Sequence, residues 1–157
     1  GVLREDDDAS RTPQPGLDEL QRVVDDVRRT GTPVELVVTG EAVSLPRTAD
    51  LAAFRMVQEA LTNVVKHAPS GSAALVALDW SPAGLRIRVQ DDGAGAEKPD
   101  AEGMSGRGLF GMRERLTLVG GHLERAGPDP SGPGGFLVEA WIPVPEAQRP
   151  DDEGSHQ

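Results

Sequence analysis

The stretch of sequence that decides the fold reads Phe54-Arg-Met-Val-Gln-Glu-Ala-Leu-Thr-Asn-Val-Val-Lys-His-Ala68. Its apolar residues recur at helical steps, which predicts a helix over about residues 48–68 that Pro69 ends. Four polar residues follow each other at helical steps of three and four: Glu59, Asn63, Lys66 and His67. Because residues at these steps share one face of a helix, an acid, an amide, an amine and an imidazole are expected to lie together.

This polar face predicts a site for a metal ion and a polyphosphate. The neutral amide oxygen of Asn63 suits Mg²⁺, which prefers oxygen ligands and takes the rest of its shell from water and substrate phosphates. Lys66 and His67 can neutralise phosphate oxygens or donate to them, and Glu59 can orient a nucleophile or accept its proton. The alternative for this face, taken alone, is a set of solvated side chains.

Composition narrows the class of protein. The chain has 157 residues, a formal net charge of -10 and no cysteine. The negative charge argues against general nucleic-acid binding, which needs clustered Lys and Arg, and the lack of cysteine excludes disulfides and thiolate chemistry. No apolar run approaches the roughly 20 residues of a membrane span, and no signal peptide is visible. We therefore expect a cytoplasmic fragment, whose start at Gly1 leaves any membrane-anchored or sensor portion outside it.

Three regions are expected along the chain: an acidic linker over residues 1–16, one domain over residues 17–144 and a polar tail over residues 145–157. Helical periodicity predicts helices over residues 17–30, 48–68 and 109–119. Short β-branched or alternating runs predict strands over residues 34–39, 73–79, 85–90, 122–125 and 136–142. These elements favour an α+β fold, in which one mixed sheet of about five strands is covered by the helices on one face.

Two glycine motifs follow the long helix. The first is Asp91-Asp-Gly-Ala-Gly95, directly after a predicted strand. Its glycines allow a turn and the close approach of a ligand, and a carboxylate at a strand end can accept a hydrogen bond from an exocyclic amine such as that of adenine. The second is Gly106-Arg-Gly-Leu-Phe-Gly-Met-Arg-Glu-Arg115, whose glycines stand just ahead of a predicted helix, where free N–H groups attract phosphate. Alone, the first motif is more typical of a surface turn and the second of a flexible loop.

Together, and in this order, the three motifs resemble the ATP-binding catalytic domain of bacterial sensor histidine kinases, within the wider superfamily of gyrase, heat-shock chaperone, histidine kinase and mismatch-repair ATPases. Gln58-Glu-Ala-Leu-Thr-Asn63 with Lys66-His-Ala68 is similar to the family's N box, residues 91–95 to its G1 box and residues 106–112 to its G2 box. The details are similar to the subfamily whose kinases pair with regulators that have helix-turn-helix output domains. The resemblance covers about residues 33–144 and implies the two-layer Bergerat ATP-binding fold.

The resemblance also implies a role for each matched residue. Asp91 would bind the adenine amine in a pocket shaped by Gly93 and Gly95. Asn63 would hold Mg²⁺ against the phosphates, and Glu59, as the catalytic residue, would polarise the acceptor histidine or a water. The other implied ATP-binding residues are Lys66, His67, Gly106, Arg107, Gly108, Leu109 and Gly111, of which Gly106 and Gly108 would let a lid close over the phosphates.

The implied reaction is transfer of the γ-phosphoryl group of ATP to a histidine, for relay to an aspartate of a response regulator. The acceptor is expected on a dimerisation domain outside this chain, whose own histidines are His67, His122 and His156. His122 begins a predicted strand, where a half-buried structural role is expected. The chain is expected to be monomeric and to bind no nucleic acid.

Two alternatives to a histidine kinase stay open. One is a serine kinase of the anti-sigma-factor kind with the same fold, and the other is a module that holds nucleotide or a partner without catalysis. The Lys66-His67 pair and the acidic N-terminal lead favour the histidine kinase. For Arg113 and Arg115 we expect salt bridges, with contacts to phosphates or to a partner domain as the alternative.

Overall fold

The computed structural model of the chain describes residues 15–93, 106–128 and 135–145. These residues form one 3-10 helix, η1 (Leu17–Glu19), three α-helices and five strands. The helices are α2 (Leu20–Arg29), α3 (Arg47–His67) and α4 (Gly106–Leu118). The strands are β1 (Val34–Thr39), β2 (Ala74–Trp80), β3 (Gly84–Asp91), β4 (His122–Pro128) and β5 (Phe136–Pro143). Three expected segments lie outside the described residues: the lid after residue 94, the tail from residue 146 and most of the linker.

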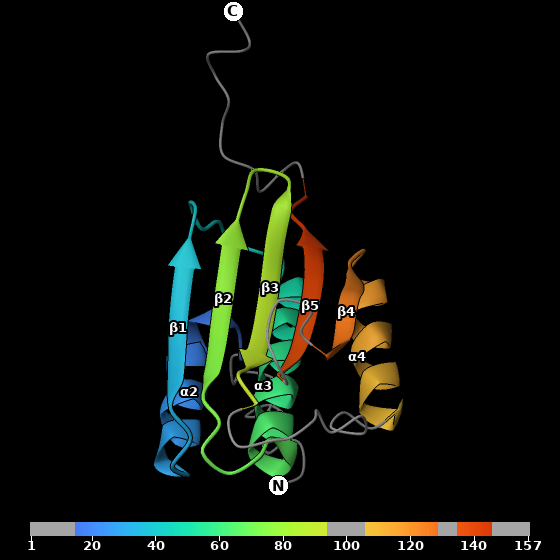
Figure 1. Cartoon of the computed structure of the whole chain (residues 1–157). Helices are drawn as coiled ribbons and strands as arrows, with labels where there is room; N and C mark the ends of the chain where they lie inside the picture. The colour runs from blue at the N-terminus through green and yellow to red at the C-terminus, as the bar shows by residue number, and fades with distance from the viewer. Residues whose placement is uncertain (1–14, 94–105, 129–134, 146–157) are drawn as a thin grey trace, which may run out of the picture.

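The strands form one mixed sheet in the order β1-β2-β3-β5-β4. β1 pairs with β2 in parallel, and the other neighbouring pairs are antiparallel. Figure 1 shows the helices together on one face of this sheet, with α2 behind β1, α3 behind β3 and α4 beside β4. The expected α+β architecture, a mixed five-stranded sheet with helices on one face, is therefore confirmed.

The core lies between the sheet and the helices. Alternation along β3 turns Leu85, Ile87 and Val89 toward the helix layer, where all are buried. Val57 and Leu61 of α3 meet them from the other layer and have no exposed surface. Each such side chain contributes about 1.5–3 kcal/mol on burial, so this layer contact holds α3 against the sheet.

The ends of α2 and α3 follow from glycine and proline. Gly31 has a φ of 99°, a left-handed conformation that glycine adopts readily, and the helix stops before it. Pro46 stands at the start of α3, and Ala68 is extended just before Pro69, as a following proline requires. α3 therefore occupies its predicted range to within one residue, whereas the helix predicted over residues 17–30 is divided into η1 and α2.

The start of α4 differs from the prediction. The sequence pattern placed the helix over residues 109–119, whereas it runs from Gly106 to Leu118. Glycine is a poor helix former, so the pattern alone placed the first glycines before the helix. Met112 and Leu116 are fully buried, and α4 packs against α3. This packing is the tertiary contact that stabilises the helix in spite of its glycines.

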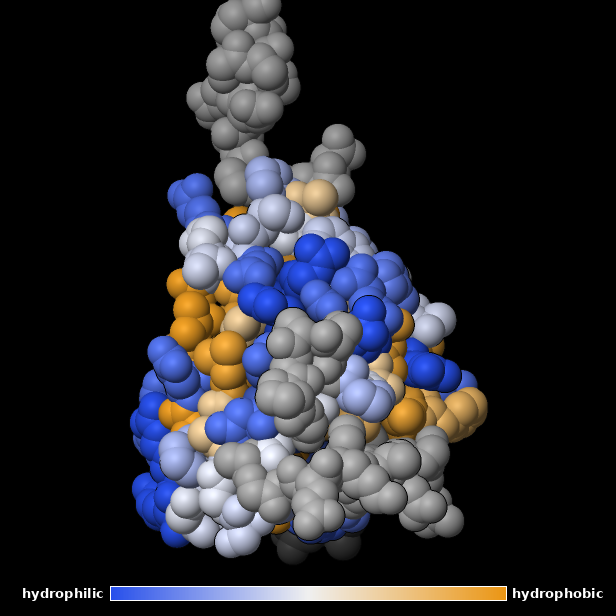
Figure 2. Space-filling model, viewed as in Figure 1, coloured by the Kyte–Doolittle hydropathy of each residue, from blue (hydrophilic) through white to orange (hydrophobic). Residues whose placement is uncertain are grey.

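The face of the sheet opposite the described helices carries a charged network. Arg86 of β3 lies 3.1 Å from Glu124 and 3.4 Å from Glu139, and its guanidinium stands 5.2 Å from the ring centre of Trp141. Figure 2 shows hydrophilic side chains gathered over β3, β5 and β4, and apolar ones over β1 and β2. His122 lies 3.2 Å from Glu124 with 58% of its side chain exposed. The expected half-buried role of His122 is therefore wrong, because it stands on the edge strand β4 of the sheet.

Candidate nucleotide-binding site

Three element ends lie toward the same end of the molecule. α3 ends at His67, β3 ends at Asp91 and α4 begins at Gly106, all at the lower end of Figure 1. α3 packs against both β3 and α4. The fold therefore places the described parts of the three sequence motifs, which lie far apart along the chain, toward one end of the molecule.

The carboxyl group of Asp91 is buried at this end. The alternation of β3 continues to Asp91, so its side chain faces the helix layer and the residue is only 7% exposed. Its Oδ1 accepts the backbone N–H of Gly93 at 2.9 Å, and Gly93 has a φ of 59°. This hydrogen bond offsets part of the cost of burying the polar carboxyl group. Asp91 is therefore a fixed acceptor, suited to a donor such as an exocyclic amine.

The neighbouring carboxylate has a different role. Asp92 is exposed, and its Oδ1 accepts the backbone N–H of Ala73 at 3.0 Å. The backbone N–H of Asp92 in turn donates to the carbonyl oxygen of Ala73, also at 3.0 Å. These two bonds extend the pairing of β2 with β3 past Asp91 and fix the start of the glycine turn.

Gly135 belongs to the same region, and the sequence motifs do not include it. A Cβ atom at this position would lie 2.1 Å from the backbone oxygen of Asp91 and 3.1 Å from its carbonyl carbon. Any side chain would therefore push β5 away from the end of β3. The sequence signal that could have identified it is a glycine directly before the strand predicted to begin at Phe136.

On α3, a local hydrogen bond orients the amide of Asn63. Its Nδ2 donates to the backbone oxygen of Glu59 at 3.0 Å. Because the amino group faces the helix backbone, the amide oxygen faces away from it, as a cation ligand must. Lys66 and His67 follow on the same face and are exposed. The predicted polar face of α3 is thus present, with Asn63 as its oriented member.

Glu59 contacts the neighbouring helix. Its Oε1 lies 2.6 Å from Nη2 of Arg115 on α4. The salt bridge expected for Arg115 is therefore confirmed, and its partner is a predicted site residue. No spacing rule could have shown this pairing, because the two residues lie on different helices.

The first turn of α4 supplies backbone donors. Its first positions are Gly106, Arg107, Gly108 and Leu109. The N–H groups of a helix's first turn have no intrahelical partner, and with the helix dipole they favour an anion. Gly111 lies further along, where a Cβ atom would stand 3.6 Å from Nη1 of Arg115. Gly95, the last glycine of the first motif, lies outside the described residues.

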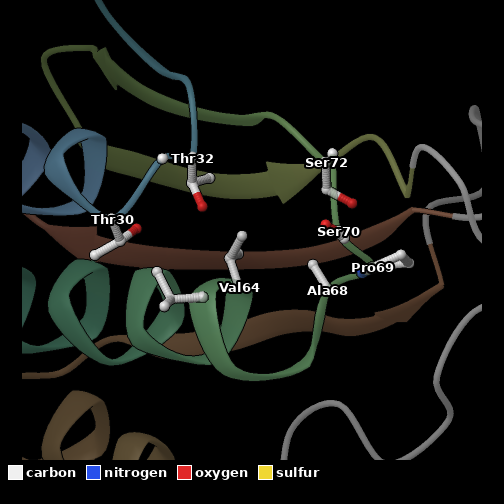
Figure 3. Close-up of a pocket in the computed structure, with 10 residues that line it drawn as sticks. Thr30, Thr32, Val64, Ala68, Pro69, Ser70 and Ser72 are labelled. Carbon is white, nitrogen blue, oxygen red and sulfur yellow. The ribbon is translucent and has the colours of Figure 1, made fainter.

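A cleft of about 320 Å³ lies on the other side of α3. Figure 3 shows it between the end of α2, the start of β1 and the turn after α3. Its hydroxyl-bearing lining residues are Thr30, Thr32, Ser70 and Ser72. At about 100° per residue, Val64 in this cleft points away from Asn63 and Lys66. None of the predicted site residues lines it, so the nucleotide is not placed there.

The described residues fit a purine nucleotide with a divalent cation. Asp91 offers a buried acceptor, Gly135 allows close backbone packing beside it, and α4 offers N–H groups for phosphates. No group of three His, Cys, Asp or Glu in the described ranges could hold a metal by itself. Mg²⁺ usually keeps several waters and takes further ligands from substrate phosphates, so a single protein oxygen such as the amide of Asn63 is compatible with this ion. Along the same ranges, no helix has the length and apolar character needed to cross a membrane.

The family match and the similar proteins indicate the same family for this chain. The model of the family described as histidine kinase-, DNA gyrase B-, and HSP90-like ATPase matches residues 48–146. Sensor histidine kinase YxjM of Bacillus subtilis (strain 168) is 34% identical over 131 residues, which cover 82% of this chain and 30% of that protein. Sensor histidine kinase LiaS of the same strain is 30% identical over 143 residues, which cover 90% and 37%.

A solved structure agrees with these relatives. The histidine kinase domain of the blue-light activated histidine kinase from Erythrobacter litoralis EL346 superposes with a TM-score of 0.57 and 26% identity, over 80% of this chain and 63% of that one. The family match runs from the start of α3 through β5 and contains Glu59, Asn63 and Asp91. The chain therefore belongs to the histidine kinase-, DNA gyrase B- and HSP90-like ATPase family, as an ATP-binding domain of the sensor histidine kinase type.

Proposed function

We propose that this domain binds ATP with Mg²⁺ where α3, β3 and α4 meet, and transfers the γ-phosphoryl group to a histidine on a separate dimerisation domain. The observation that carries the proposal is the buried, hydrogen-bonded carboxylate of Asp91 at the same end of the molecule as the oriented amide of Asn63. The relatives named as sensor histidine kinases support it, although the chain spans only 30 to 37% of their length. Relay to a response regulator aspartate, and a cytoplasmic location, are part of the same proposal.

The chain's own residues divide the work of binding. Asp91 accepts a hydrogen bond from the adenine amine, and the N–H groups at the start of α4 bind phosphate oxygens. Asn63 offers its amide oxygen to Mg²⁺, which when bound neutralises charge on the transferring phosphoryl group. Lys66 and His67, which are exposed on the same face of α3, add positive charge or donors toward the phosphates. Catalysis in this scheme consists of positioning and charge stabilisation.

The phosphoacceptor is proposed to lie outside the described residues. His67 belongs to the polar face of α3, where it adjoins the nucleotide rather than receiving its phosphoryl group. His122 lies on the sheet face opposite the described helices, paired with Glu124. Glu59 is proposed to polarise the incoming histidine, because it stands on the same face of α3 as Asn63, one turn earlier. The domain alone is expected to bind nucleotide and hardly to label itself.

Calorimetry of ATP binding with Mg²⁺ and with a chelator tests the nucleotide site. Asn63→Ala is expected to abolish the Mg²⁺-dependent part of the affinity. Thr62→Ala is the matched control, because Thr62 is the exposed neighbour of Asn63 on α3 and its hydroxyl donates to the helix backbone at Gln58. Phosphoryl transfer to a supplied dimerisation domain that survives Asn63→Ala unchanged would show that the metal assignment is wrong.

The chemistry of the labelled partner separates the histidine kinase from the serine kinase. Phosphohistidine is acid-labile and phosphoserine is not, so label lost on acid treatment is the expected result. Label that resists acid would favour the serine kinase. If calorimetry shows no ATP binding with Mg²⁺ present, the domain is instead a non-catalytic module.

A further inference from the structure

An ion pair joins the proposed catalytic carboxylate to the helix that carries the second glycine motif. Oε1 of Glu59 lies 2.6 Å from Nη2 of Arg115. The two side chains are 39% and 36% exposed, yet each contacting atom has less than 1 Å² of accessible surface. Water is therefore excluded from the contact itself, although other atoms of both side chains reach solvent.

The pair compensates two buried charges. Within the described ranges neither contacting atom has a hydrogen-bond partner. The loss of water around each charged group is therefore offset by the opposite charge of the other residue. Exposed ion pairs contribute little because water screens them, and the pair of Arg28 with Asp25 on α2 is of that kind. Removing either member of the Glu59–Arg115 pair would instead leave a poorly solvated charge without its partner.

The packing of α4 fixes the direction of Arg115. Met112 and Leu116, on either side of it along the helix face, are buried against the core. One turn earlier, Gly111 has no side chain, and a Cβ atom there would stand 3.6 Å from Nη1 of Arg115. The Arg115 side chain therefore extends toward the N-terminus of α4, and its guanidinium reaches Glu59 on α3. Gly106 is about 13 Å away along the helix axis, at roughly 1.5 Å per residue, so this cation serves Glu59 and not the first turn of α4.

We propose that Arg115 is a positioning residue, which holds the Glu59 carboxylate in the orientation that phosphoryl transfer requires. The inference rests on the proposed function of Glu59 and deepens it, because it names the group that fixes this carboxylate. Since Arg115 belongs to α4, the orientation of Glu59 is also tied to the placement of the helix that carries the phosphate-binding N–H groups. A shift of α4 against α3 then moves the phosphate donors and the carboxylate together.

Thermal unfolding of the chain without nucleotide tests the pair itself. Glu59→Gln and Arg115→Gln are each expected to lower the Tm by at least about 2 °C, since each leaves a poorly solvated partner. The Tm of the double variant is expected to be no lower than that of the less stable single variant, because the second change removes no further contact. Arg113→Gln is the matched control, since Arg113 is exposed on the same helix. Additive losses in Tm would overturn the pair and the proposal with it.

Transfer kinetics test the positioning role in a kinase that carries its phosphoacceptor domain. Arg115→Gln is expected to lower kcat about 10- to 100-fold, with KM for ATP changed by less than about threefold. Arg115→Lys is expected to recover part of the loss, since it restores the charge but not the planar geometry. On a Glu59→Gln background, Arg115→Gln is expected to cause no further loss.

Two kinetic results would overturn the proposal. If Arg115→Gln raises KM for ATP more than about tenfold at unchanged kcat, Arg115 binds the nucleotide directly. If it lowers kcat equally with and without Glu59, it does not act through that carboxylate. Failure of the proposed function has a different signature: Glu59→Gln itself would leave kcat unchanged while the unfolding experiment still shows a coupled pair.

Discussion

The backbone N–H of Leu17 donates a 2.9 Å hydrogen bond to Oδ1 of Asp50, which joins the start of η1 to the first turn of α3. Gly16 packs against the same carboxylate, because a Cβ atom there would lie 2.0 Å from Oδ2. The carboxylate also stands at a helix N-terminus, where negative charge is favoured. This contact joins residues 16–17, at the start of the domain, to α3, which carries the proposed catalytic face.

Asp50→Ala is therefore expected to lower the free energy of unfolding by about 1 kcal/mol, or the Tm by about 2–4 °C. Asp50→Asn keeps an acceptor oxygen for the N–H of Leu17 and is expected to lose less than half of that. Denaturant or thermal unfolding of the two variants provides the comparison. Equal losses would show that charge at the helix end matters and that the hydrogen bond does not.

Asp91→Asn is expected to weaken ATP binding by about 10- to 100-fold, the loss typical of a hydrogen bond to a charged group. The variant keeps an oxygen for the N–H of Gly93 but replaces the other carboxylate oxygen with a donor, which would face a donor amine. Asp92→Asn is the matched control, because Asp92 is exposed and its contact with Ala73 needs only one acceptor oxygen. Calorimetric titration with ATP measures both, and comparable affinity losses would contradict the assignment of the adenine contact to Asp91.

Gly135→Ala is expected to weaken nucleotide binding and to lower stability, because the new Cβ atom must displace the backbone at Asp91. Gly127→Ala on β4 is the control, since a Cβ atom there meets nothing within 4 Å. We expect the first variant to lose about 1–3 kcal/mol of stability and the second to match the parent protein. Unfolding and ATP titration of both variants check this, and a Gly135→Ala protein with unchanged affinity would remove Gly135 from the site.

The charged network of the sheet gives a pH-dependent contribution to stability. The hydrogen bond from Arg86 holds the pKa of Glu124 below its usual value, against the opposing effect of burial, and His122 lowers this pKa further. A folded-state pKa that is depressed gives stability above the unfolded-state pKa, and this stability is lost as the pH falls through the folded value. Glu124→Gln is therefore expected to cost about 0.2–1 kcal/mol near pH 7 and less near pH 3. Unfolding curves at both pH values check the prediction, and a cost that does not change with pH would contradict it.

The regular elements could be predicted because their signals are local. Alternation in residues 85–90 and the β-branched run of residues 34–39 predicted strands that the structure contains. Gly31 and Pro69 marked helix ends by backbone chemistry alone. The start of α4 was missed because helix propensity opposes glycine there, while buried contacts at Met112 and Leu116 outweigh it.

The site could be predicted only as a set of motifs. Asn63 and Asp91 were proposed because helix steps and strand ends have sequence patterns, and the elements that carry them end at the same end of the fold. The contact of Glu59 with Arg115 was not predictable, because it joins residues on two helices with an intervening sheet hairpin in the chain. The close approach of Gly135 to the end of β3 is equally a product of strand order.

The length of α3 amplifies at Asn63 any tilt that begins at Asp50. Asp50 stands in its first turn and Asn63 near its last, about 20 Å apart at roughly 1.5 Å per residue. A helix of this length bends little, so a tilt of about 3° at the Asp50 end displaces Asn63 by about 1 Å. Such a displacement is large against the near-ideal distances that Mg²⁺ demands of its ligands. Because Asn63 is the proposed Mg²⁺ ligand, a change in how Gly16 and Leu17 hold Asp50 would move this amide relative to the rest of the proposed site.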